Sequence, residues 1–160
     1  MRIAIISDSH DNLANLKKVL DWLKKNKIAA LIHCGDVFRK GTVGFISKNF
    51  KGKIYISLAD VDDDIKKVSR VKFWKNYGHI KIDNKKLAFA HLPEIATTLA
   101  LSQKYNLVFY GHLHKPWKTK IKKTILANPG NVAGIFFKPT FAVYDTKTDK
   151  LDLKILEKLS

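Results

Sequence analysis

Aspartate and histidine residues follow the apolar segments of this chain in a regular way, so they are the first candidates for chemistry. Two of them form an Asp-x-His pair and two form a His-x-His pair, and residues two apart can point the same way in an extended or tightly turned segment. Because ligands bind at the carboxyl ends of strands in α/β sheets, we expect these side chains to meet at one place. In chain order they are Asp8, His10, Asp36, His91, His112 and His114.

Carboxylate and imidazole groups together favour a divalent metal site. They suit Mn, Fe, Zn and similar ions, and a carboxylate can bridge two of them. Two ions about 3.5–4 Å apart polarise a phosphoryl group and generate a hydroxide near neutral pH. A single Asp after a strand is usually a cap, and a single His is usually structural, but the ordered set favours a shared site. His33 and His79 lie outside this pattern, and we expect both to be structural.

The elements that must position these residues can be predicted from the hydrophobic pattern. The first half alternates apolar runs with amphipathic stretches, as parallel α/β proteins do, and the second half contains more hairpins. Two packed sheets with helices outside would accommodate both halves. The expected strands are 2–7, 29–34, 53–58, a hairpin within 79–91 that turns at Asp83 and Asn84, 106–110, and hairpins within 117–128 and 141–156; the expected helices are 12–25, 41–49, 63–76 and 94–104.

Composition indicates one globular domain, residues 1–160, with a strongly basic surface. The chain has 30 Lys and Arg against 14 Asp and Glu, a formal charge of +16, which attracts phosphate esters or nucleic acid. Lysine-rich composition is also common in heat-adapted proteins, so the charge alone does not identify a partner. No run approaches the roughly 20 apolar residues of a membrane span. With a single cysteine, Cys34, there is no internal disulfide, and we expect a cytoplasmic protein.

An acidic cluster and a basic segment each have two interpretations. Asp60, Asp62, Asp63 and Asp64 directly follow the segment 53–58, and the last two suit the first turn of a helix. The basic segment 115–123 could attract polyanions, with Trp117 stacking on a base. Alternatively, its lysines could form the solvent-exposed face of a strand.

Several of these motifs together resemble the calcineurin-like metallophosphoesterase superfamily, in particular its small single-domain bacterial and archaeal phosphodiesterases. The resemblance covers nearly the whole chain. The motifs are SDSHDN at 7–12, HCGD at 33–36, LADVD at 58–62, AHLP at 90–93, GHLH at 111–114 and NPGN at 128–131. The resemblance implies an α/β fold, a four-layer αββα sandwich of two mixed β-sheets flanked by helices.

The resemblance also implies ligands and a mechanism. Asp8, His10 and His114 would hold one metal, Asp36 would bridge both, and His91 and His112 would hold the second. Asp60 stands at a further ligand position, where the family usually has Asn, and Val61 stands where it often has His. Two divalent ions, of Mn, Ni, Zn or Fe, would hold a hydroxide that attacks phosphorus in line.

The implied function is a phosphodiesterase acting on small phosphodiesters. Two alternatives stay open. One is a nuclease or RNA-processing phosphodiesterase, for which nucleic acid would be the partner. The other is a catalytically weakened, metal-binding interaction scaffold. A homodimer is compatible with the sequence, and no membrane partner is expected.

Overall fold

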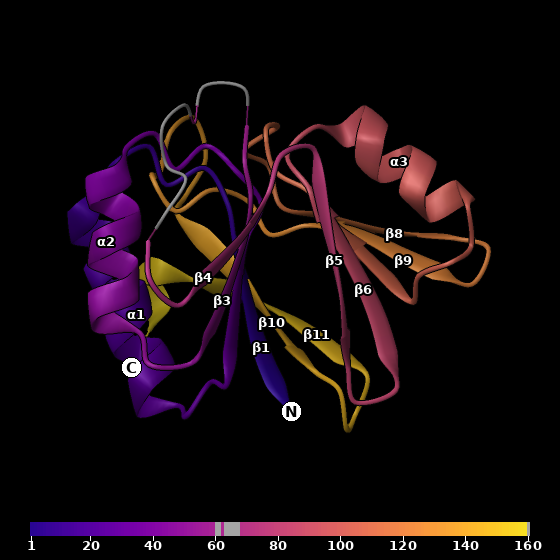
Figure 1. The fold of residues 1–160 in the computed structure, drawn as a ribbon, viewed down its shortest axis with the longest axis horizontal. Coiled ribbons are helices and arrows are strands. Elements are labelled where there is room, and N and C mark those ends of the chain that lie inside the picture. Colours follow the sequence, from indigo (N-terminus) through magenta and orange to yellow (C-terminus); the bar gives the residue numbers. More distant parts are fainter. Residues whose placement is uncertain (60–61, 63–67, 160) are drawn as a thin grey trace.

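The computed structural model describes residues 1–59, 62 and 68–159, and two β-sheets packed face to face dominate it (Figure 1). The first sheet is mixed. Strands β1 to β4 run parallel to one another, and β10 is antiparallel to both of its neighbours, β1 and β11. In spatial order its strands are β11 (Lys150–Ile155), β10 (Thr140–Asp145), β1 (Arg2–Ile6), β2 (Ala30–His33), β3 (Lys53–Ser57) and β4 (Val71–Trp74).

The second sheet is also mixed. Its three central strands are parallel, and an antiparallel strand closes each edge. In spatial order its strands are β5 (Tyr77–Ile82), β6 (Lys85–Ala90), β7 (Leu107–Phe109), β9 (Thr124–Asn128) and β8 (Trp117–Ile121). The second half of the chain is therefore less antiparallel than its hairpin pattern indicated, because helix α3 (Pro93–Leu101) makes a parallel crossover from β6 to β7.

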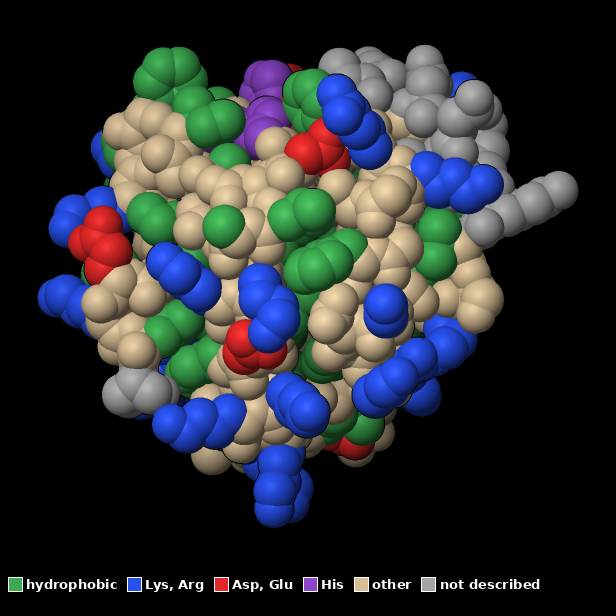
Figure 2. Space-filling view, turned by 90° about the vertical axis from the view of Figure 1, so that its left-hand side faces the viewer, with side chains coloured by type: hydrophobic (Ala, Val, Ile, Leu, Met, Phe, Trp, Pro, Cys, Tyr) green, Lys and Arg blue, Asp and Glu red, His purple; other side chains and the backbone are tan. Residues whose placement is uncertain are grey.

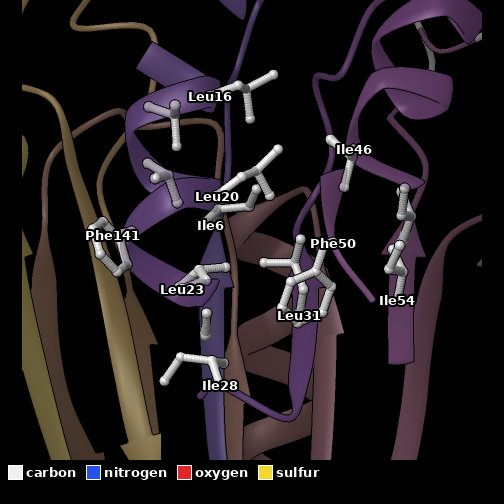
Figure 3. Packing of buried hydrophobic residues seen from close by; sticks show 14 of the residues in the cluster. Ile6, Leu16, Leu20, Leu23, Ile28, Leu31, Ile46, Phe50, Ile54 and Phe141 are labelled. Carbon is white, nitrogen blue, oxygen red and sulfur yellow. The ribbon is translucent and has the colours of Figure 1, made fainter. Parts of the chain in front are cut away.

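Helices cover the outer faces of both sheets, so the predicted four-layer αββα sandwich is confirmed. Helices α1 (Leu13–Lys25) and α2 (Lys40–Asn49) lie on the first sheet, and α3 lies on the second. Leu16, Leu20 and Leu23 recur on one face of α1 and pack on the sheet (Figure 3). A 3-10 turn, η1 (Leu156–Lys158), packs beside α1.

The parallel strands place their carboxyl ends at one edge of the molecule. In the first sheet, Ile6 of β1 pairs with His33 of β2, so the loops that follow these strands begin at the same level. In the second sheet, Phe89 of β6 pairs with Phe109 of β7, and the loops carrying the predicted histidines follow there. The inner faces of both sheets form a buried apolar core that includes Ile5, Ile32 and Phe109.

The predicted helix 63–76 is wrong over its last part, because Val71–Trp74 forms strand β4 along the edge of the first sheet. Residues 63–67 lie outside the described part of the chain. The segment VKFW is rich in β-branched and aromatic residues, and parallel pairing with β3 satisfies its backbone. Helix α3 is also shorter than predicted, since it ends at Leu101 and not at residue 104.

The remaining predicted elements are observed within two residues of their expected ends. His33 ends β2 and His79 lies on β5, as expected for structural histidines. Cys34 is buried between the sheets. Within the described residues, no helix combines the length and hydropathy that crossing a membrane would require.

Candidate metal centre

The loops that carry the predicted ligands adopt an unusual backbone conformation. A positive φ costs a residue with a side chain of order 1–3 kcal/mol, and such residues gather at functional sites. Here it occurs at Asp8 (49°), His10 (42°), Asp36 (57°), His112 (67°) and His114 (57°). The strained turns direct side chains from successive loops toward one point.

Hydrogen bonds between the loops hold these turns in place. The Asp8 amide donates to the carbonyl of Gly35 at 3.0 Å, and the His10 amide donates to the carbonyl of Asp36 at 3.1 Å. The His112 amide donates to the Asp8 carboxylate at 3.1 Å. The loops after β1, β2 and β7 are thus joined by hydrogen bonds that the predicted ligand residues themselves make.

Four of the predicted ligands form a compact cluster. One ligand atom from each of Asp8, His10, Asp36 and His114 lies within 4.8 Å of the others. The Nε2 atoms of His10 and His114 are 3.1 Å apart. Asp8 Oδ1 lies 3.3 Å from His114 Nε2, and Asp36 Oδ2 lies 3.5 Å from His10 Nε2.

His91 and His112 lie on the other side of Asp36. The Nε2 atom of His91 is 3.8 Å from Asp36 Oδ2, and the rings of His91 and His112 have centroids 5.2 Å apart. Both histidines and Asp36 line a pocket of about 200 Å³, whose other walls include Leu58, Ala59, Leu92 and Ile95. Asp36 therefore stands between the two groups of histidines.

The ring of His91 is oriented as that of a metal-binding histidine would be. Its Nδ1 lies 3.0 Å from the carbonyl of Cys34, and since a carbonyl only accepts, Nδ1 carries the proton. The lone pair is then on Nε2, which faces Asp36. Metal-bound histidines are usually fixed by such a bond from their second nitrogen. Gly35 makes room for this ring, because a Cβ there would lie 2.8 Å from it.

Burial dominates the electrostatics of the cluster. The side chain of Asp8 is completely buried, and burial raises the pKa of its carboxyl to about 7. Burial likewise lowers the pKa of His10, an effect that the nearby Asp36 carboxylate opposes. A buried carboxylate facing imidazole nitrogens can supply electron-pair donors, and a cation among them would favour the ionised form of Asp8. The donor set therefore fits a divalent ion.

Asp62 shapes this site through its backbone contacts. Its carboxylate is buried and accepts hydrogen bonds from the amides of Asp36 (3.1 Å), Val37 (2.9 Å), Phe38 (2.8 Å) and Ala59 (2.8 Å). The sequence placed Asp62 in an acidic cluster and in the motif LADVD, but did not predict that it binds these amides. The other members of that cluster, Asp60, Asp63 and Asp64, lie outside the described residues, as does Val61.

Two polar residues that the sequence did not single out line the pocket. Lys75 and Asn76 belong to the turn between β4 and β5, and they were missed because this segment was predicted as the end of a helix. The strand-like VKFW followed by Lys-Asn-Tyr-Gly was the signal for a turn here.

Asn131 of the NPGN motif also supports the site. Its Nδ2 donates to the carbonyl of His114 at 3.1 Å, and its Oδ1 accepts from the amide of Ile135 at 2.8 Å. The basic segment 115–123 forms β8 and its turns, and Trp117 lines a separate groove with Phe109 and Leu153.

A two-sheet α/β sandwich with an aspartate and histidine cluster at its strand ends defines a class of metal-dependent hydrolases. A family model for the calcineurin-like phosphoesterase superfamily domain matches residues 1–149. The chain belongs to this superfamily, so the expected family and enzyme class, a metallophosphoesterase, are confirmed.

Individual relatives agree with this assignment. A phosphodiesterase of Methanocaldococcus jannaschii is 25% identical over 170 residues, which cover 98% of this chain and all of the relative. The solved structure of an archaeal phosphodiesterase superposes with a TM-score of 0.86 at 23% identity, covering 97% of this chain and 99% of that one. Vps29 of Chaetomium thermophilum shares the fold at a TM-score of 0.73 and 14% identity, covering 97% and 95% of the two chains.

Proposed function

We propose that this protein is a phosphodiesterase that hydrolyses small phosphodiesters with the help of two divalent metal ions. The observation that carries the proposal is the position of Asp36. Its Oδ2 atom lies 3.5 Å from His10 Nε2 and 3.8 Å from His91 Nε2. A carboxylate oxygen within reach of two groups of imidazoles can bridge a pair of ions.

The proposed ligands divide into two groups around this residue. Asp8, His10 and His114 would hold the first ion with Asp36. His91 and His112 would hold the second ion with Asp36, and Asp60 is retained as a further ligand by its place in the motif. Bound ions would polarise the phosphate ester and lower the pKa of a bound water.

The residues around the ligands would bind and orient the substrate. The pocket beside Asp36, His91 and His112 is walled by Leu58, Leu92 and Ile95, which would exclude water from one side of the ester. Lys75 lines the same pocket and would attract the phosphate. Asp62 would keep Asp36 in place through the amides of residues 36–38.

Several finer assignments belong to the same proposal. The ions would be Mn, Ni, Zn or Fe, because oxygen and nitrogen ligands accept any of these. The 160 residues would form one domain. A cytoplasmic location agrees with the single buried Cys34. A homodimer is compatible with this function.

The test is hydrolysis of bis-p-nitrophenyl phosphate by metal-stripped protein, with Mn²⁺, Ni²⁺ or Zn²⁺ added back. We expect turnover only with added metal. Asp36→Asn should lose at least about 100-fold in kcat/KM, because it removes the shared charged ligand. The control is Asp21→Asn, an exposed carboxylate on α1 that pairs with Lys17.

A second variant, Asp60→Asn, tests the acidic ligand position. If wild-type protein turns over, Asp60 is compatible with catalysis. If every metallated form, including Asp60→Asn, shows no hydrolysis of any phosphate ester, the proposed function is wrong.

A further inference from the structure

Two exposed phenylalanines lie beside the histidines of the metal cluster. The ring of Phe38 is 5.1 Å from that of His10, and the ring of Phe136 is 6.1 Å from that of His114, measured between centroids. Phe38 is 43% exposed and Phe136 is 90% exposed. Figure 2 shows hydrophobic side chains on both sides of the histidines at the upper edge of the molecule.

Both rings are held outside the core at a cost in backbone energy. Phe38 has a φ of 79° and Phe136 a φ of 60°, a region that bulky residues rarely occupy. Neither ring is buried in exchange for this strain. An exposed, strained aromatic residue beside a reactive cluster is a reason to infer function.

Two residues, Asp62 and Asn131, hydrogen-bond the backbone at or next to the two phenylalanines and also the backbone of the cluster residues. The Phe38 amide donates to Asp62, which also accepts from the amide of Asp36. Asn131 bonds both the carbonyl of His114 and the amide of Ile135, next to Phe136. The position of each ring is thereby linked to the position of a neighbouring ligand.

We propose that Phe38 and Phe136 form an aromatic clamp around the metal cluster, in which either ring can stack on the base of a nucleotide substrate. This inference rests on the proposed function and narrows it to phosphodiesters of nucleosides. A phosphate at the cluster has its ester substituents within reach of the two rings, because each ring contacts one of the cluster histidines. Stacking on phenylalanine tolerates any base, since every base has a π-face.

The arrangement favours a nucleotide over a protein partner at this position. A large continuous apolar patch would favour a protein partner. Here the polar side chains of His10 and His114 lie between the two rings. A nucleotide matches this alternation, because it joins an anionic phosphate to an aromatic base.

The first test measures binding and needs no turnover. We would titrate Mn²⁺-loaded protein with AMP and with ribose 5-phosphate, which lacks only the base, by calorimetry. We expect AMP to bind roughly 10-fold more tightly, as stacking of a base predicts. In the double variant Phe38→Asn, Phe136→Asn this preference should fall to about twofold or less.

The variants are chosen so that the fold is preserved. Asparagine tolerates a positive φ better than phenylalanine does, so thermal stability should not fall. Phe136→Trp should keep the preference for AMP, because it keeps a ring. Trp117→Ala is the control, an aromatic residue that is 58% exposed and lines the separate groove.

The second test separates this inference from the proposed function. The p-nitrophenyl esters of thymidine 5′-phosphate and of its abasic analogue, 1,2-dideoxyribose 5-phosphate, have the same leaving group and differ only in the base. Hydrolysis of both with equal kcat/KM, or equal binding of AMP and ribose 5-phosphate by the wild type, would overturn the clamp alone. If the preference for AMP depends on the two rings but neither ester is hydrolysed, the clamp would be supported and the proposed phosphodiesterase function would be wrong.

Discussion

Asp62 shows how a residue can determine a metal site without being one of its predicted ligands. Its two carboxylate oxygens accept four backbone hydrogen bonds, three of them from the loop that carries Asp36. That loop has to keep Asp36 and Phe38 at positive φ, which both residues would otherwise avoid.

Replacing Asp62 by Asn should therefore affect both stability and metal binding. One carboxylate oxygen becomes an NH₂ group that faces two amide donors and cannot accept from them. We expect a loss of about 1–3 kcal/mol in the free energy of unfolding, measured in urea, and weaker Mn²⁺ binding by calorimetry. Asp152→Asn, a partly exposed carboxylate on β11, should change stability by less than about 0.5 kcal/mol.

His33 is the clearest titrating group outside the predicted ligands. It is completely buried, and burial lowers its pKa from the ordinary 6.5 to about 3. The Gly35 amide donates to its Nδ1 at 3.2 Å, so the proton of the neutral ring is on Nε2, which faces the Ser9 hydroxyl at 3.0 Å. A second proton on Nδ1 would point at the Gly35 amide.

This arrangement predicts an acid dependence of stability with a definite sign. Between pH 6.5 and about 3 the unfolded chain binds a proton at His33 and the folded chain does not. The free energy of unfolding should then fall as the pH is lowered through this range, by up to about 1.4 kcal/mol per pH unit from this residue. In His33→Asn, urea titrations from pH 6.5 to 4.5 should show a shallower slope. An unchanged slope would mean that His33 is protonated in the folded state.

Glycine residues at the ends of strands allow the elements to approach closely enough to form the site. Gly111 follows β7, and a Cβ there would lie 2.7 Å from Asp8 Oδ2 and closer still to the hydroxyl of Ser7. The second sheet can thus approach the first only where this position has no side chain.

Gly111→Ala should destabilise the protein and impair the metal site together. We expect about 1–3 kcal/mol lower stability, because a buried contact must shift, and weaker Mn²⁺ binding, because the contact is with Asp8. The matched control is Gly44→Ala in α2, where a Cβ would meet nothing within 4 Å. That change should stabilise the protein by about 0.5–1 kcal/mol, as it removes a helical glycine. Equal effects of the two changes on Mn²⁺ affinity would contradict the argument.

The whole molecule carries a formal charge of +16 over 160 residues, and much of it is on exposed lysines (Figure 2). Such an excess repels itself in the compact state, while it attracts anionic substrates from a distance. Few described acidic groups pair with these lysines, and the observed pairs, such as Lys17 with Asp21, are exposed and worth little.

Stability should for this reason increase with ionic strength. The screening length falls from about 10 Å at 0.1 M to about 3 Å at 1 M, so added salt weakens the self-repulsion. We expect Tm in NaCl to rise by several degrees between about 0.02 M and 0.5 M. A Tm that stays constant or falls over this range would show that the charges are already compensated.

The sequence by itself determined the parts of this protein that depend on local pattern. Asp8, His10, Asp36, His91, His112 and His114 follow strands whose apolar runs are unambiguous, and the parallel order of those strands brings their ends to one edge. The four layers were implied by the family resemblance, and the mixed pattern of alternating runs and hairpins is compatible with them.

The tertiary structure alone decided what depends on partners far apart in the chain. Segment 71–74 contains strand-forming residues but was predicted as part of a helix, and pairing with the parallel edge of β3 makes it a strand. That pairing carries Lys75 to the pocket. The position of Phe136 beside His114 depends on the hydrogen bonds of Asn131 to His114 and Ile135. A sequence pattern does not predict these bonds, because they form only when the two loops pack together.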